Sequence, residues 1–172
     1  DIEEFSIELG LHVGIVKEFG EYKLSLHSGS EKTSVYKKFS EITNGLFHIK
    51  TSGTSWLESL RVIALKNTAL FRKLYDYSVK RYQEEKKSYH ISTAFSSIPD
   101  ISMFEEDHYG EMLDLKECRQ MLHIIFGAVL TEKDKGAPIF SDDIYKTLFV
   151  NETLHYKYLE ENISRHLNYL NI

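Results

Sequence analysis

The first third of the chain alternates between two hydrophobic periods. From Ile2 to Phe19, apolar residues recur every three or four positions, which predicts a helix that ends near Gly20. Two shorter segments, Tyr22–His27 and Leu46–Lys50, alternate apolar and polar residues with period two, which predicts strands. A turn and a helical pattern follow each strand. The order strand, helix, strand, helix predicts two parallel βα units with right-handed crossovers.

Both predicted strands are amphipathic, which is unusual in an open parallel sheet. Leu24 and Leu26 share one face of the first strand, and the polar residues share the other. If the apolar faces pack on helices, the polar faces turn inward together. A barrel whose interior ends in an active site explains this pattern better than a flat sheet. The expected fold class is therefore α/β, the C-terminal portion of a TIM-like (β/α) barrel.

Beyond residue 66 the hydrophobic period is mostly that of helices. We expect one long helix from Asn67, a second over Leu115–Val129 and a last one from Ser141 onward, with a mobile connection over 91–113. Residues 1–172 are thus expected to form a single domain. Its βα units occupy residues 1–66 and its helical remainder occupies residues 67–172.

Composition narrows the class of protein. The chain has 172 residues, of which 42% are hydrophobic and 27% are charged, as in folded globular domains. Its net charge of −5 argues against a general nucleic-acid binder. A lone cysteine, Cys118, excludes an internal disulfide and fits a reducing, cytoplasmic compartment. Because Asp1 opens the chain inside a helical pattern, we expect a piece of a longer protein.

The strongest chemical signal lies at the ends of the two predicted strands. His27 ends the first strand and His48 lies late in the second, on the face that is expected to turn inward. Two imidazoles there could approach one another or one divalent metal ion. Lys50 shares the face, and buried charges need partners, which favours a functional role. The alternative is that each histidine is only a hydrogen-bonded strand residue.

Two turns rich in glycine and hydroxyl groups link the strands to the helices that follow them. Such turns expose backbone N–H groups at helix N-termini, where a phosphate or carboxylate can bind. Lys32 and Lys50 add positive charge beside them. Simple N-capping is the alternative, and neither turn matches a nucleotide-binding motif. His155 and His166 lie on the apolar stripe of the last predicted helix and are expected in the core, and His123, in the helix from Leu115, is expected to be structural.

Residues 22–32 and 46–61 resemble the tagaturonate epimerase family, with weaker similarity at 89–92, 118–123 and 151–167. The resemblance covers most of the chain and matches the C-terminal part of longer proteins. It implies a TIM-barrel-like, divalent-metal-dependent enzyme of hexuronate catabolism. Such enzymes interconvert D-tagaturonate and D-fructuronate by inverting one hydroxyl-bearing carbon.

The resemblance also implies roles for particular residues. A metal ion (Zn, Mn, Co, Ni or Fe) is expected at His27, while the catalytic acid and base are expected before Asp1, so that the chain alone is inactive. The resemblance and the two turns together indicate which residues bind the substrate. These candidates are Ser28, Gly29, Ser30, Lys32, His48, Lys50, Thr51, Gly53, Thr54 and Ser55.

Expected partners are a keto-hexuronate substrate and either the missing N-terminal half or a second copy of the chain; no nucleic acid and no membrane are expected. Two alternatives stay open. One is a barrel-type sugar-phosphate isomerase or aldolase, and the other is a non-catalytic helical interaction module.

Overall fold

A computed structural model describes residues 1–20, 22–27, 33–89 and 91–170. The helices are α1 (Ile2–Phe19), α2 (Tyr36–Thr43), α3 (Ser52–Lys66), α4 (Thr68–Glu85), α5 (Lys116–Ile124), α6 (Phe126–Thr131), α7 (Ser141–Val150) and α8 (Glu152–Leu170). The strands are β1 (Leu24–His27), β2 (Phe47–Lys50), β3 (Lys133–Asp134) and β4 (Ala137–Pro138). Short 3₁₀ segments are η1 (Thr33–Val35), η2 (Lys86–Ser88), η3 (Phe95–Ser97), η4 (Ile101–Met103) and η5 (Glu106–Asp114).

The chain folds as two compact units. The first comprises Asp1–Thr54 with Glu160–Ile172, and the second comprises Ser55–Leu159. The boundaries fall inside α3 and α8. The expectation that residues 1–172 behave as one domain stays a prediction.

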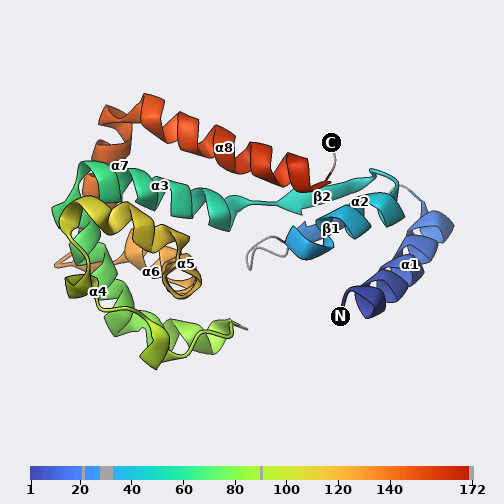
Figure 1. Cartoon of the computed structure of the whole chain (residues 1–172), viewed down its shortest axis with the longest axis horizontal. Helices are drawn as coiled ribbons and strands as arrows, with labels where there is room; N and C mark the ends of the chain where they lie inside the picture. The colour runs from blue at the N-terminus through green and yellow to red at the C-terminus, as the bar shows by residue number, and fades with distance from the viewer. Residues whose placement is uncertain (21, 28–32, 90, 171–172) are drawn as a thin grey trace. The chain divides into compact units, whose positions relative to one another are not determined.

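In the first unit, β1 and β2 pair in parallel, as the strand–helix order predicts. Their apolar faces pack on α1, α2 and the end of α8, and Figure 1 shows α2 alongside the two strands. The buried cluster is made of Leu9, Leu26, Tyr36, Phe39 and Leu170. Phe39 of α2 meets Phe47 of β2 with ring centroids 5.3 Å apart. Burial of these apolar groups holds the small sheet on its helices.

The chain leaves α2 through a tight left-handed turn. Asn44 and Gly45 have φ angles of 52° and 75°, a region that glycine adopts readily and asparagine tolerates. The backbone N–H of Gly45 donates to the carbonyl of Ser40 at 3.1 Å, which satisfies one of the last free carbonyls of the helix. This turn sends the chain back into β2 beside β1.

The second unit is a helical bundle around a larger apolar core. Four of its helices, α3 to α6, and the segment η5 supply most of the buried side chains. Trp56 donates its indole N–H to the carbonyl of Leu122 at 3.0 Å, and Phe71 meets Tyr109 at 5.6 Å between ring centroids. These contacts join α3 to α5 and α4 to η5.

A buried ion pair fixes η5 to α3. Glu58 is 1% exposed, and Arg61 donates to its carboxylate at 3.1 Å. The other guanidinium nitrogens of Arg61 donate to the carbonyls of Gly110 and Leu113 and to Asp114. Because Arg61 spans Glu58 and η5, it orders a segment that has few helical signals of its own.

Three expectations for the helical part are corrected by the structure. The helix expected over Leu115–Val129 is interrupted at Ile125, between α5 and α6, and the last helix is interrupted at Asn151, between α7 and α8. Residues 91–113, expected as a mobile connection with few periodic positions, contain regular structure and contribute to the core. They form 3₁₀ turns whose apolar residues enter the core, including Met112. Hydrophobic period alone does not locate these breaks, because the apolar stripe continues across them.

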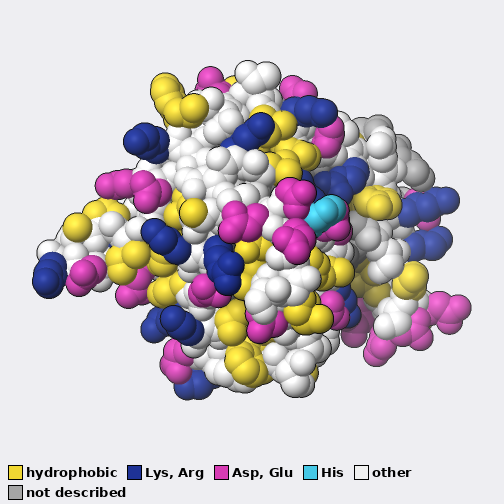
Figure 2. Space-filling model, turned by 60° about the vertical axis from the view of Figure 1, so that its left-hand side comes forward, with side chains coloured by type: hydrophobic (Ala, Val, Ile, Leu, Met, Phe, Trp, Pro, Cys, Tyr) yellow, Lys and Arg dark blue, Asp and Glu magenta, His cyan; other side chains and the backbone are white. Residues whose placement is uncertain are grey.

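The surface carries mixed charge. On the face shown in Figure 2, acidic and basic side chains are interspersed, with apolar side chains between them. None of the helices in the described ranges combines the length and the apolar character of a membrane-spanning helix.

Candidate functional site

The polar face of the β1–β2 pair gathers three of the candidate residues. In the parallel register, His27 is the partner of Lys50 and Ser25 is the partner of His48. All four side chains point to the same face, because strand residues two apart share a side. His27 and His48 are diagonal neighbours there, a separation of about 7–8 Å between Cα atoms in a regular sheet.

The structure corrects one expectation about this face. His27, His48 and Lys50 are exposed, whereas the sequence pattern predicted that they turn into an interior. The apolar side of each strand is buried on α1, α2 and α8, and nothing among the described residues buries the opposite side. Because Lys50 is exposed, its charge does not require a buried partner, and the functional role that was inferred from such burial is not supported by the described residues.

The turn after β1 contains the other predicted substrate-binding residues. Ser28, Gly29, Ser30 and Lys32 lie outside the described residues. Their proposed contacts with substrate stay predictions.

The turn after β2 leads directly into α3. Thr51, Gly53 and Ser55 are half-buried, and Thr54 is buried. The backbone N–H and the hydroxyl of Thr54 both donate to the carbonyl of Thr51, at 3.0 and 2.8 Å. The turn is thus closed on itself at the carboxyl end of β2, next to Lys50.

A buried histidine from α8 meets this turn. His166 is 6% exposed; its Nε2 lies 3.1 Å from Thr54 Oγ1 and its Nδ1 lies 3.1 Å from the hydroxyl of Tyr36. Asn162, one turn earlier on α8, donates to the same Thr54 oxygen at 3.3 Å. The sequence placed His166 in the core, as the structure does, but did not reveal its link to the strand-end turn.

Two other histidines, His155 and His108, lie elsewhere. His155 belongs to the second unit, where its Nε2 is 2.9 Å from Ser59 Oγ, and burial lowers its pKa. His108 is exposed beside Glu111, whose hydrogen bond raises the pKa of that imidazole. Neither belongs to the strand-end group.

The described residues supply only part of a metal site. Within 1–20, 22–27, 33–89 and 91–170, no group of three or more His, Cys, Asp or Glu side chains is placed to hold a metal ion. An exposed imidazole such as that of His27 can supply one nitrogen ligand to a metal ion. Among the described residues, His27 could therefore hold a metal ion only together with ligands from outside these residues.

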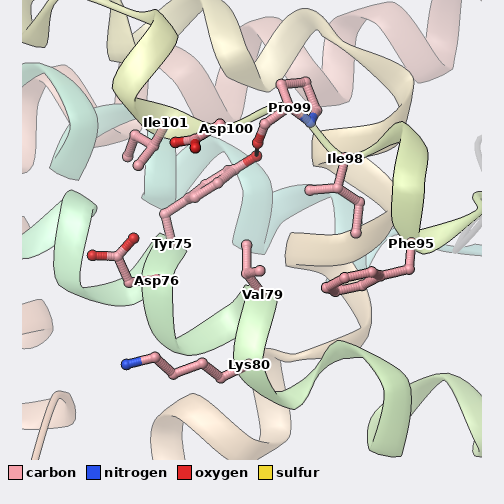
Figure 3. A pocket seen from close by; sticks show the side chains of 9 residues that line it. All are labelled: Tyr75, Asp76, Val79, Lys80, Phe95, Ile98, Pro99, Asp100 and Ile101. Carbon is pink, nitrogen blue, oxygen red and sulfur yellow. Dashed lines mark hydrogen bonds between the residues drawn. The ribbon is translucent and has the colours of Figure 1, made fainter.

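The second unit contains a separate cavity of about 520 Å³ between α4 and residues 95–101. Figure 3 shows Val79, Ile98 and Phe95 around it, with Asp76 and Lys80 along α4. The hydroxyl of Tyr75 donates to the carbonyl of Pro99 at 2.8 Å, so it is engaged by the protein. The cavity contains none of the candidate residues and offers mainly apolar surface.

Parallel βα units with polar side chains at the carboxyl ends of their strands define an α/β protein of the kind that binds small ligands at that edge. Comparison with known proteins gives the family. The family model described as tagaturonate epimerase (UxaE) matches residues 1–170, and the chain belongs to that family. The resemblance expected from the sequence is thereby confirmed.

Individual relatives agree with the family. The curated tagaturonate/fructuronate epimerase of Thermotoga maritima is 39% identical over 170 residues, 99% of this chain and 34% of that protein. A crystal structure of fructuronate-tagaturonate epimerase UxaE from Cohnella laeviribosi in complex with one glycerol is 36% identical, with a TM-score of 0.88 over 99% of this chain and 35% of that one. The native crystal structure of the same enzyme is 37% identical, also with a TM-score of 0.88. The chain thus spans about a third of the length of these relatives.

Proposed function

We propose that this chain is the C-terminal part of an epimerase that interconverts D-tagaturonate and D-fructuronate. The observation that carries the proposal is the match of nearly the whole chain to relatives named for this reaction. The geometry agrees with it, because the described polar groups that could contact a sugar acid gather at the carboxyl ends of β1 and β2. The TIM-like barrel stays part of the proposal, since the described strands form only two-stranded sheets.

The chain's own residues would bind and orient the substrate. Lys50 carries a positive charge at the end of β2, suited to the carboxylate of a hexuronate. His48 and the backbone of Thr51 and Gly53 offer hydrogen bonds to hydroxyl groups along the sugar chain. The hydroxyl of Thr54 already has three protein partners, so we assign it to the shape of the turn.

His27 is the residue of this chain that we propose as a metal ligand. It fits as one imidazole donor at the end of β1, with the remaining ligands and the acid and base supplied by other parts of the full-length protein. A bound divalent cation would polarise the keto and hydroxyl oxygens of the substrate as a Lewis acid.

One helix face supports a role within a longer polypeptide. Leu9 is buried and Phe5, Val13 and Val16 are half-buried on one side of α1. The opposite side carries a second apolar stripe whose members are each more than half exposed: Ile7, Leu11, Ile15 and Phe19. A helix that is apolar on both sides is typical of a protein interior. We propose that the rest of the epimerase chain covers this stripe, in keeping with relatives about three times as long.

The test is turnover by the full-length protein. Incubation with D-tagaturonate should yield D-fructuronate, and the reverse, as measured by liquid chromatography against both standards. Phosphorylated ketoses, offered in parallel, should not react. Absence of turnover on both sugar acids would overturn the proposal.

Two variants test the role of Lys50. Lys50→Met should raise KM for either sugar acid, because it removes the charge that faces the carboxylate. Lys37→Met removes another exposed lysine, on α2, and should leave KM unchanged. Equal kinetics in both variants would contradict the assignment of Lys50.

A further inference from the structure

One buried imidazole joins the helices that follow the two strands. Tyr36 is the first residue of α2, which follows β1, and Thr54 lies in the first turn of α3, which follows β2. His166 contacts both, with Nδ1 and Nε2 each 3.1 Å from a hydroxyl oxygen. All three side chains belong to the first unit.

The hydrogen bonds around Thr54 favour one arrangement of protons for a neutral His166. A threonine hydroxyl has one proton, and the shortest of its contacts is with the carbonyl of Thr51, to which it donates at 2.8 Å. With that proton engaged, Thr54 Oγ1 accepts from His166 Nε2–H and from the amide of Asn162. A neutral His166 then carries its proton on Nε2, and its Nδ1 accepts from the hydroxyl of Tyr36.

Burial makes each of these bonds costly to lose. Thr54 and Tyr36 are almost completely buried, and Asn162 is 4% exposed. A buried donor or acceptor left without a partner costs about 1–3 kcal/mol. The ring of His166 also stacks on that of Tyr36, with centroids 5.6 Å apart. These contacts hold the imidazole in one orientation and favour that tautomer.

We infer that His166 is a positioning residue for the proposed sugar-acid site. It holds Thr54 in place, Thr54 holds the carbonyl of Thr51, and Thr51 follows Lys50 directly. The inference rests on the proposed function, since it assigns His166 to the substrate contacts of Lys50 and of the turn after β2. His166 touches neither substrate nor reacting atoms and acts through Thr54.

Two substitutions of His166 separate its two hydrogen bonds. In the full-length enzyme, His166→Gln can still donate to Thr54 from an amide nitrogen near the place of Nε2, so KM should stay within about threefold. His166→Asn keeps an acceptor near Nδ1 for Tyr36 but loses the donor to Thr54, so KM should rise about tenfold or more with a smaller change in kcat. His155→Gln, on the same helix, is the matched control and should keep wild-type KM.

A purely structural role gives a different result. It would lower the melting temperature of both His166 variants alike and leave KM of the folded enzyme unchanged, which would overturn the inference. Thr54→Val and Thr54→Ser provide the second test if the His166 variants fail to fold. Valine should raise KM as His166→Asn does, and serine, which keeps the hydroxyl, should restore it.

The tautomer can be measured without activity. ¹⁵N NMR of histidine-labelled protein should show His166 protonated at Nε2 and unprotonated at Nδ1, and the reverse pattern would overturn the inference. Turnover failure of the wild-type enzyme on both sugar acids would overturn the proposed function, and with it this role. An active wild type whose His166→Asn variant keeps its KM would overturn the positioning role alone.

Discussion

Replacing Arg61 by methionine tests whether the buried ion pair holds the second unit together. Methionine keeps the apolar stem and removes the guanidinium. The change leaves Glu58, 1% exposed, without its partner at 3.1 Å, and removes the donors to the carbonyls of Gly110 and Leu113. Arg119 stays near the carboxylate, with a nitrogen 3.9 Å away.

The expected cost follows from these contacts. Removing one member of a buried ion pair typically costs about 3–5 kcal/mol. Arg119 offsets part of this, and the bond to the exposed carboxylate of Asp114 contributes little because water screens it. We expect a loss of about 3 kcal/mol in the free energy of unfolding. If the free energy of unfolding falls by about 2 kcal/mol for each molar of urea, the urea concentration at which half of the protein is unfolded falls by about 1.5 M.

Urea titration followed by far-ultraviolet circular dichroism measures this loss. The matched control is Arg81→Met, since Arg81 pairs with Glu85 at 3.0 Å but is 44% exposed. Its expected cost is below about 0.5 kcal/mol. The double variant Arg61→Met/Glu58→Leu should recover much of the loss, because no buried charge is left without a partner. Equal midpoints for Arg61→Met and Arg81→Met would refute the reasoning.

Three further predictions concern backbone conformation, pH and thiol reactivity. Gly45→Ala should destabilise the chain by about 1 kcal/mol in urea titrations because φ is 75°, whereas Gly10→Ala, in open space on α1, should stabilise it. Burial lowers the pKa of His155, so the unfolded chain binds its proton more readily. The free energy of unfolding should therefore fall as pH drops below about 6.5, and His155→Gln should flatten that dependence; an unchanged slope would contradict it. Burial also raises the pKa of Cys118, which is fully buried, so Ellman's reagent should label it only at the rate of unfolding. Rapid labelling of the native protein would exclude this burial.

Much of the first unit could be predicted from the sequence because its signals are local. The period-two segments form the parallel pair β1–β2, and Asn44-Gly45 marks the left-handed end of α2. The exposure of the polar strand face could not be predicted, because alternation shows that two faces differ but not which layers cover them.

The candidate site was predicted only in part. His27, His48 and Lys50 do share one face, as their spacing indicates. The link between Tyr36, Thr54 and His166 was missed, since the two hydrogen bonds to the imidazole span 130 and 112 positions along the chain. The available signal was a histidine on an apolar helix stripe, which must find polar partners when buried. Sequence spacing does not name those partners.

The most direct test of the account compares the full-length protein with its His27→Ala variant. Formation of D-fructuronate from D-tagaturonate and the bound divalent metal are measured in both. Turnover and bound metal are expected in the wild type, and loss of both in the variant. The two proteins should have the same melting temperature once the metal is removed by a chelator, because His27 is exposed. Equal turnover and equal metal content in the two proteins would contradict the assignment of the strand ends as part of an epimerase site.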